Sequence, residues 1–215
     1  MSAEQHTHGE FLQHHFHSPA QQESSAKLGM WLFLAQEVLF FGGLFVAYGV
    51  VRYLYPETML AGHEYLNVPM GAVNTIVLIT SSLTMALGVR AAQTNNQKKL
   101  LLHVSLTILF ACVFLIIKYF EYTHKIHVGL VTARAFSAEG IAGSPHIFFS
   151  LYFVMTGLHG LHVIAGIVCL LWILKRARKK EFSSAYYTPV ENVGLYWHLV
   201  DLVWIFLFPL LYLVK

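Results

Sequence analysis

Charged residues are scarce in this sequence. Only 12% of its 215 residues are Asp, Glu, Lys or Arg, while 56% are hydrophobic. A soluble domain carries about 25% charged residues. The mean hydropathy is +0.57. These values exclude an ordinary soluble domain and predict an integral membrane protein.

Signatures of reactive sites are also absent. The two cysteines, Cys112 and Cys169, lie inside apolar segments and there is no C-x-x-C motif, so we expect neither a disulfide nor a thiol redox site. The sequence has no glycine-rich phosphate loop, nucleophile elbow or H-E-x-x-H motif. No internal repeat is evident, which disfavours an inverted-repeat transporter. The net charge of +3 resides in loops and gives no case for binding nucleic acid.

What the sequence does contain is five long apolar runs. Each is long enough, at ~1.5 Å rise per residue, to cross or nearly cross a ~30 Å hydrocarbon core as a helix. The runs are solid rather than alternating, which argues against a β-barrel. The sequence therefore predicts an all-α integral membrane protein, a bundle of five transmembrane helices. We expect the spans at about 28–54, 68–91, 99–120, 146–175 and 191–214.

A polar segment precedes the first run. We expect residues 1–26 to form a cytoplasmic tail and residues 27–215 to form the transmembrane domain. The segment lacks the basic start and short apolar core of a cleaved signal peptide. It contains five histidines, which are His6, His8, His14, His15 and His17. Their irregular spacing, without cysteine, favours a solvated tail over a metal site.

The positions of Lys and Arg predict the orientation. Nine of the fourteen lie on the side that holds the N-terminus and the second and fourth loops. Because positively charged loops stay cytoplasmic, we expect the N-terminus in the cytoplasm and the C-terminus outside. The basic cluster at 175–180 is suited to anionic lipid headgroups.

Glu37 is the most informative residue, because it lies about ten residues inside the first apolar run. A carboxylate at that depth costs at least a few kcal/mol, so it indicates a functional site. Counting from the cytoplasmic ends places His162 and Asp201 at a similar depth. Such groups face the bundle interior and pair with one another. We therefore hypothesise that Glu37 pairs with His162 across the first and fourth helices.

Helical spacing supports a polar interior. One face of the fifth run holds Glu191, Gly194, His198 and Asp201, since they are spaced by three and four. The fourth run contains G-L-H-G-L-H at 157–162, and its glycines permit close helix approach. Gly42 and Gly43 near Glu37 permit the same closeness on the first run. Interhelical hydrogen bonding without further function is the alternative interpretation of these groups.

Three other interpretations concern metal binding and proton transport. A b-type haem between His159 or His162 and His198 is one. An E-x-x-H pattern starting at Glu121 suits a di-metal bundle only if repeated, and it is not repeated. Because this pattern follows Lys118 at the expected end of a span, we interpret it as surface polarity. A small proton-coupled transporter, with a relay through Glu37, His162 and Asp201, is the third possibility.

The sequence resembles subunit III of haem–copper terminal oxidases, most closely the cytochrome c oxidase type in its five-helix form. The matching segments follow the family's order and cover nearly all of the chain after the tail. They are Q-E-V-L-F-F at 36–41, N-T at 74–75 with S-S at 81–82, E-Y at 121–122, T-G-L-H-G-L-H-V at 156–163 with Gly166, and Glu191 followed by Y-W-H-L-V-D-L-V-W at 196–204.

This resemblance implies a non-catalytic subunit of a bacterial inner-membrane oxidase, with no cofactor of its own. Haem and copper would reside in partner subunits. Subunit I, which reduces O₂ and pumps protons, would pack directly against this chain, with other oxidase subunits or a respiratory supercomplex around it. The family's third subunit is associated with structural phospholipid and with sustaining proton uptake. A quinol oxidase or a nitric oxide reductase accessory protein stays open, since other subunits recognise the electron donor.

The resemblance also suggests roles for individual residues. Glu37 matches the family's intramembrane carboxylate, and His159 and His162 match its two histidines. Arg176 falls where the family has a basic residue suited to a lipid phosphate. Gln36 departs from the family, which usually has a small hydroxyl residue there. We expect the Glu37–His162 pair to line or close a lipid-facing cleft, although the longer family members' first two helices, one wall of that cleft, are missing.

Overall fold

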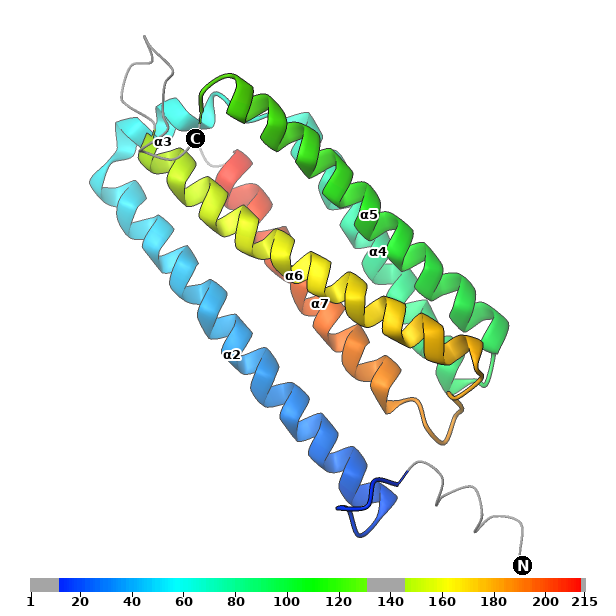
Figure 1. Ribbon diagram of the computed structural model, residues 1–215. Coiled ribbons are helices and arrows are strands. Elements are labelled where there is room, and N and C mark those ends of the chain that lie inside the picture. The colour runs from blue at the N-terminus through cyan, green and yellow to red at the C-terminus, as the bar shows by residue number, and fades with distance from the viewer. Residues whose placement is uncertain (1–11, 131–145, 214–215) are drawn as a thin grey trace, which may run out of the picture.

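The protein, seen in a computed structural model, is a bundle of long helices (Figure 1). The structure describes residues 12–130 and 146–213. Within these ranges the helices are α2 (Pro19–Leu54), α3 (Pro56–His63), α4 (Val68–Gln93), α5 (Gln97–His127), α6 (His146–Arg178), α7 (Thr188–Phe208) and the π-helix η1 (Pro209–Leu213). Five of these segments, with α7 and η1 as one, are long and apolar enough to span a membrane. The predicted all-α, five-span fold is confirmed.

Helix α2 begins at Pro19, earlier than the predicted start at residue 28. The Ser18 side chain accepts a hydrogen bond from the Gln21 backbone N–H, and Pro19 occupies the first helical position. Both features favour a helix start, because they use or remove backbone donors that have no partner inside the helix. Part of the predicted tail is therefore helical. His14, His15 and His17 are exposed, whereas His6 and His8 lie outside the described residues.

A short helix after α2 was not predicted. Helix α3 starts at Pro56 and buries Met59, Gly62 and His63. A Cβ at Gly62 would overlap the Phe148 side chain at the start of α6. Only glycine allows α3 to lie so close to α6, so this helix covers one end of the bundle.

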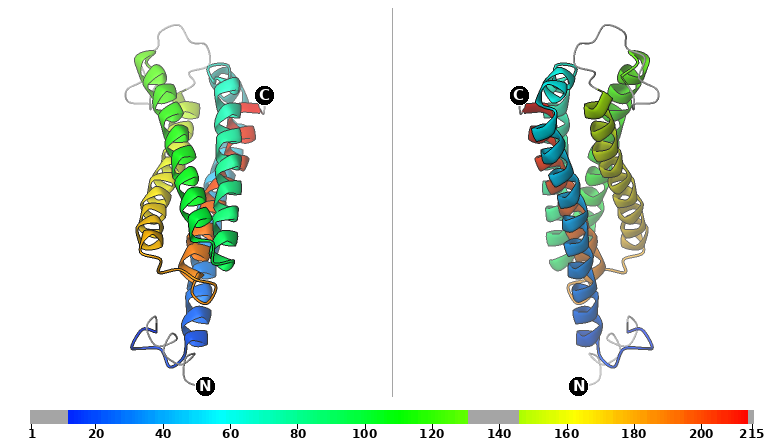
Figure 2. Two further views of the ribbon diagram at one scale, coloured as in Figure 1. Left: turned by 90° about the vertical axis from the view of Figure 1, so that its right-hand side faces the viewer. Right: turned by 90° about the vertical axis from the view of Figure 1, so that its left-hand side faces the viewer.

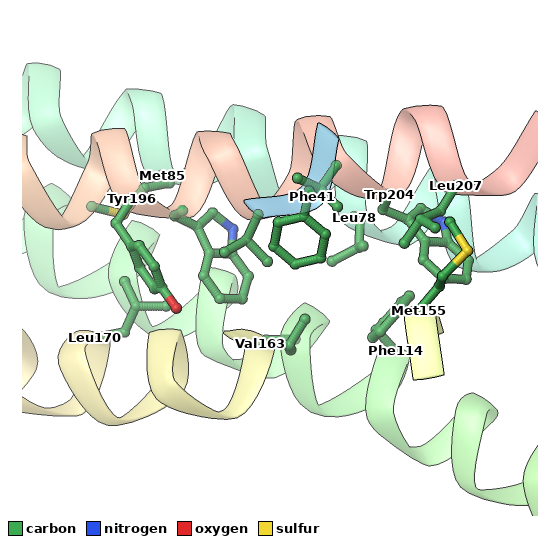
Figure 3. Close-up of a cluster of buried hydrophobic side chains, with 14 of the residues drawn as sticks. Phe41, Leu78, Met85, Phe114, Met155, Val163, Leu170, Tyr196, Trp204 and Leu207 are labelled. Atoms are coloured by element: carbon green, nitrogen blue, oxygen red, sulfur yellow. The ribbon is translucent and has the colours of Figure 1, made fainter. Parts of the chain in front are cut away.

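Helix α7 lies at the centre of the bundle, with α4 and α6 against it (Figures 1 and 2). About 44% of its most apolar stretch is buried inside the protein, against 17% for α2. Core side chains from α2, α4, α5, α6 and α7 meet in the bundle, among them Trp204 of α7 (Figure 3). Trp197 of α7 is also fully buried. A Cβ at Gly166 of α6 would lie 2.6 Å from the Trp197 ring. The glycine therefore lets the indole pack against the α6 backbone.

Two loops are joined at the end of the bundle that the charge pattern assigns to the cytoplasm. Asn95, between α4 and α5, has a left-handed φ of 55°. Its side-chain amide donates to Ser184 Oγ at 2.9 Å, and the Ser184 backbone N–H donates to its Oδ1 at 2.6 Å. Gln97 also donates to the Ala177 carbonyl. These bonds hold the α4–α5 and α6–α7 connections together.

Candidate intramembrane polar site

Glu37 and His162 form the predicted pair between α2 and α6. Glu37 Oε2 lies 3.0 Å from His162 Nε2, and Glu37 is 8% exposed. His162 Nδ1 lies 2.7 Å from the Leu158 carbonyl oxygen, which can only accept. Nδ1 therefore carries a proton, and the bond to Glu37 holds one further proton, on either the imidazole or the carboxyl. Either arrangement gives the intramembrane acid a hydrogen-bonded partner.

Aromatic rings surround this pair. Phe41 of α2 packs edge-on to the His162 ring at a centroid distance of 5.1 Å, and Phe40 lies 6.2 Å away. The Tyr196 hydroxyl of α7 donates to the His162 backbone carbonyl at 3.0 Å. The site thus joins α2, α6 and α7 through side chains in an apolar setting, where hydrogen bonds are stronger than in water.

The expectation that glycines bring the helices close together at this site is wrong. A Cβ built at Gly42, Gly43 or Gly160 would find no atom within 4 Å. Helices α2 and α6 make little backbone contact, and the long Glu37 and His162 side chains bridge the space between them. The face that these glycines occupy is open among the described residues.

His198 and Asp201 belong to a different place, the interface of α7 with α4. His198 Nδ1 lies 2.7 Å from Ser82 Oγ. Asp201 is 6% exposed, and its Oδ1 has no hydrogen-bond partner among the described residues. Nearby, Trp197 Nε1 donates to Ser81 Oγ at 3.0 Å. The groups predicted at a similar depth therefore divide into two sites, one between α2 and α6 and one between α7 and α4.

His159 stands apart from both sites. It is fully buried, with its ring 5.6 Å from Phe114 and 5.3 Å from Trp204. Neither ring nitrogen has a hydrogen-bond partner within the part of the chain that the structure describes. The alternative of an axial haem ligand does not suit His162, because hydrogen bonds engage both of its nitrogens. In residues 12–130 and 146–213, no three His, Cys, Asp or Glu side chains are arranged to hold a metal ion.

Arg176 secures the α6–α7 loop. Its Nε donates to Glu181 Oε2 at 2.6 Å, and its guanidinium lies 4.8 Å from the Trp172 ring centroid. Two further rings, those of Phe182 and Tyr186, lie at 5.1 and 5.8 Å. A lipid phosphate at Arg176 remains a prediction, and it would have to share the guanidinium with Glu181.

The interpretation of Glu121 as surface polarity is wrong. Helix α5 continues to His127, and Glu121 is 3% exposed. Its Oε1 accepts hydrogen bonds from Lys125 at 2.7 Å, Tyr152 at 2.9 Å and Tyr212 at 2.6 Å, while Oε2 accepts from Lys118 at 2.9 Å. The signal that sequence reasoning missed is the spacing of three and four from Lys118 to Glu121 to Lys125, which places all three on one helix face.

The fold and these sites define a multi-pass membrane protein whose buried polar groups tie its helices together. The family model for "Cytochrome c oxidase subunit III" matches residues 6–215. The "Cytochrome c oxidase subunit 3" of Corynebacterium diphtheriae is 35% identical over 190 residues, which is 87% of this chain and 87% of that protein. The chain belongs to the cytochrome c oxidase subunit III family.

Two further relatives bear on the assembly. The "Heme-copper oxidase subunit I+III" of Aeropyrum pernix is 31% identical over 86% of this chain and 22% of that protein. The "Probable quinol oxidase subunit 3" of Staphylococcus saprophyticus is 28% identical over 87% of this chain and 88% of that protein. Family membership implies association with other oxidase subunits, and the fused relative supports contact with subunit I.

Proposed function

We propose that this chain is a non-catalytic subunit of a cytochrome c oxidase in a bacterial inner membrane. It stabilises the catalytic subunit, holds phospholipid and sustains proton uptake during aerobic electron transport. Haem and copper reside in the partner subunits. The observation that carries this proposal is the Glu37–His162 hydrogen bond, 3.0 Å long, in a chain of this family.

The pair acts by fixing the position of α2. This helix is the least buried span, and it makes little contact with α6 apart from the pair and the Phe40 and Phe41 rings that pack on His162. Further bonds hold α2 toward its outer end, where the Tyr48 hydroxyl donates to the Leu210 carbonyl at 2.8 Å. The open surface around Gly42 and Gly43 is apolar and suits acyl chains, so the pair sets the width of a lipid-facing space.

A quinol oxidase is the second candidate, favoured by the 28% identical relative of that name. The roles proposed for Glu37 and His162 are the same in either complex, because the electron donor binds other subunits. Reduction of the purified complex by cytochrome c or by quinol distinguishes the two donors.

The experiment is to purify the oxidase through a tag on this chain, comparing wild type with Glu37→Gln. The glutamine amide cannot exchange a proton with His162, and it carries no negative charge that could pair with a protonated imidazole. We expect less co-purifying phospholipid, faster loss of activity during turnover and weaker retention of the subunit. The matched control is Glu57→Gln, an exposed acid at the start of α3. Unchanged lipid, retention and turnover stability in Glu37→Gln would refute the proposal.

A further inference from the structure

A row of protic side chains runs along one side of α6. We name it the α6 row, and it consists of Tyr152, Thr156, His159 and His162. Its members are spaced by four, three and three residues, so each is the neighbour of the next on the helix surface. The row begins beside Glu121, to which the Tyr152 hydroxyl donates at 2.9 Å. It ends at His162, which bonds to Glu37. The α6 row therefore extends from one buried acid to another.

His159 is the member of the α6 row whose side chain makes no hydrogen bond to a described residue. It is fully buried, and both Nδ1 and Nε2 lack a partner. In a neutral imidazole one of these nitrogens donates and the other accepts. An aromatic ring such as Phe114, 5.6 Å away, can receive an N–H, but it has no hydrogen bond to donate to the accepting nitrogen. A buried polar atom without a partner is disfavoured, so His159 requires a ligand that the residues around it do not supply.

Thr156, one turn before His159, can accept a further hydrogen bond. Its Oγ1 donates to the Tyr152 carbonyl oxygen at 2.6 Å. That bond uses the only hydrogen of the hydroxyl, so in its contact with Tyr122 the tyrosine hydroxyl is the donor. A hydroxyl oxygen has two lone pairs, and Tyr122 engages one of them. One acceptor site therefore remains three residues from His159, on the same side of the helix.

A second unpaired group lies at this level of the core on α4. Asn74 is fully buried, and neither its Nδ2 nor its Oδ1 has a partner within the described ranges. Thr84 and Thr107 meet between α4 and the antiparallel α5, with their hydroxyls 2.8 Å apart (Figure 1). Ten residues on from that contact, Asn74 is level with the α5 turn 114–118, and His159 packs against the same turn at its first residue. Asn74 and His159 thus approach one level of the core from two helices.

The missing ligand is a small molecule that both donates and accepts hydrogen bonds. Asn74 and His159 are each 0% exposed, so neither a lipid nor a helix of another chain reaches them. A metal ion would need more ligands, and residues 12–130 and 146–213 contain no group of three His, Cys, Asp or Glu side chains arranged for one. Water meets the requirement, because a buried water molecule makes about three hydrogen bonds to polar groups that otherwise lack partners.

We propose that His159 and Asn74 bind buried water molecules, and that one of these waters bridges a His159 ring nitrogen to Thr156 Oγ1. The waters satisfy both unpaired side chains without any change in the helices. Helices α4 and α6 make little direct contact with each other. The bound water therefore supplies polar links across a part of the bundle that side chains alone do not connect.

Electron cryomicroscopy of the chain purified with its partners, at a resolution that shows ordered water, tests this proposal directly. We expect density for water about 2.7–3.2 Å from the His159 ring nitrogens and from the Asn74 amide. One of these waters should also contact Thr156 Oγ1. A direct bond from either side chain to a protein or lipid group would overturn the inference. Both side chains without water, in a map that shows ordered water elsewhere in the spans, would overturn it too.

A pair of substitutions at one position provides a second measurement. His159→Gln keeps a donor and an acceptor for water, whereas His159→Leu is of similar size and has neither. In thermal unfolding of the full chain in mild detergent, we expect His159→Gln to melt about 2–4 °C above His159→Leu. Met155, fully buried on α6 and apolar, is the matched control. There the order should reverse, with Met155→Leu above Met155→Gln. If His159→Leu melts at the same temperature as His159→Gln or higher, the imidazole occupies a dry site and the inference fails.

Discussion

Tyr212 donates a 2.6 Å hydrogen bond to Glu121 Oε1, which ties the C-terminal π-helix η1 to α5. The same carboxylate binds Lys118 at 2.9 Å and Lys125 at 2.7 Å. Lys118 Nζ also donates to the Tyr152 and Tyr212 hydroxyls at 3.1 and 3.0 Å. Three segments far apart in sequence therefore converge on one buried acid, and the stability of the bundle at this end depends on it.

Removing the charge of Glu121 should destabilise the protein strongly. Glu121→Gln leaves Lys118 and Lys125 buried without a counter-charge, and breaking a buried ion pair on one side costs about 3–5 kcal/mol. Thermal unfolding in mild detergent measures the loss. Glu64→Gln, an exposed acid, serves as control. Adding Lys118→Met to Glu121→Gln should recover part of the stability; no recovery would show that the lysine charge is not the cause.

Tyr212→Phe should have a smaller effect of the same sign. It removes one donor to a charged acceptor but keeps the aromatic ring, and such a hydrogen bond contributes about 1.5–3 kcal/mol. Tyr53→Phe, on the exposed side of α2, should be neutral in the same unfolding measurement. Equal melting temperatures for Tyr212→Phe and wild type would contradict this prediction, because they would mean that the other donors to Glu121 suffice without the Tyr212 hydroxyl.

Gly166→Ala should destabilise the contact of α6 with α7. The added Cβ would lie 2.6 Å from the Trp197 ring, which is fully buried and cannot move freely. Overpacking of this kind costs about 1–3 kcal/mol. Gly160→Ala, also on α6, has no atom within 4 Å of the new Cβ and should be neutral or stabilising. Similar melting temperatures for the two variants would contradict the tight packing at Gly166.

Asn95 should hold the α6–α7 loop in place. Asn95→Gly keeps the left-handed backbone but removes both hydrogen bonds to Ser184, whereas Asn95→Ala also strains a φ of 55°. The left-handed region costs a residue with a Cβ about 1–2 kcal/mol. We therefore expect limited proteolysis of the loop to be fastest in Asn95→Ala, intermediate in Asn95→Gly and slowest in wild type. Any other order of proteolysis rates would show that Asn95 does not control the position of the loop.

The sequence predicts those parts of the structure that depend on helical periodicity and membrane depth. The five spans follow from long apolar runs. Equal depth, taken together with the flanking glycines, led to the correct pairing of Glu37 with His162, although depth alone also allowed Asp201. Sequence reasoning failed at Glu121, because a charged residue near the end of an apolar run is normally taken to mark the end of the span. The four partners that neutralise this acid come from α5, α6 and η1, and only the folded chain brings them together.

Glycine positions show a second limit. Gly166 and Gly42 look alike in sequence, since both lie in apolar runs four or five residues after an ionisable residue. Gly166 receives a tryptophan ring, whereas no described residue comes within 4 Å of a Cβ built at Gly42. The difference depends on which helix lies opposite, a property of the bundle that local sequence does not contain.

The hydrogen bond between Glu37 and His162 has a consequence for how the membrane potential acts on this protein. The bond joins two helices that run side by side (Figure 1), and its two atoms are 3.0 Å apart, a small fraction of a hydrocarbon core of about 30 Å. A charge gains about 2.3 kcal/mol per 100 mV only when it crosses the whole membrane. Transfer of the shared proton from oxygen to nitrogen therefore converts a neutral pair into an ion pair, while the voltage does little work on the proton.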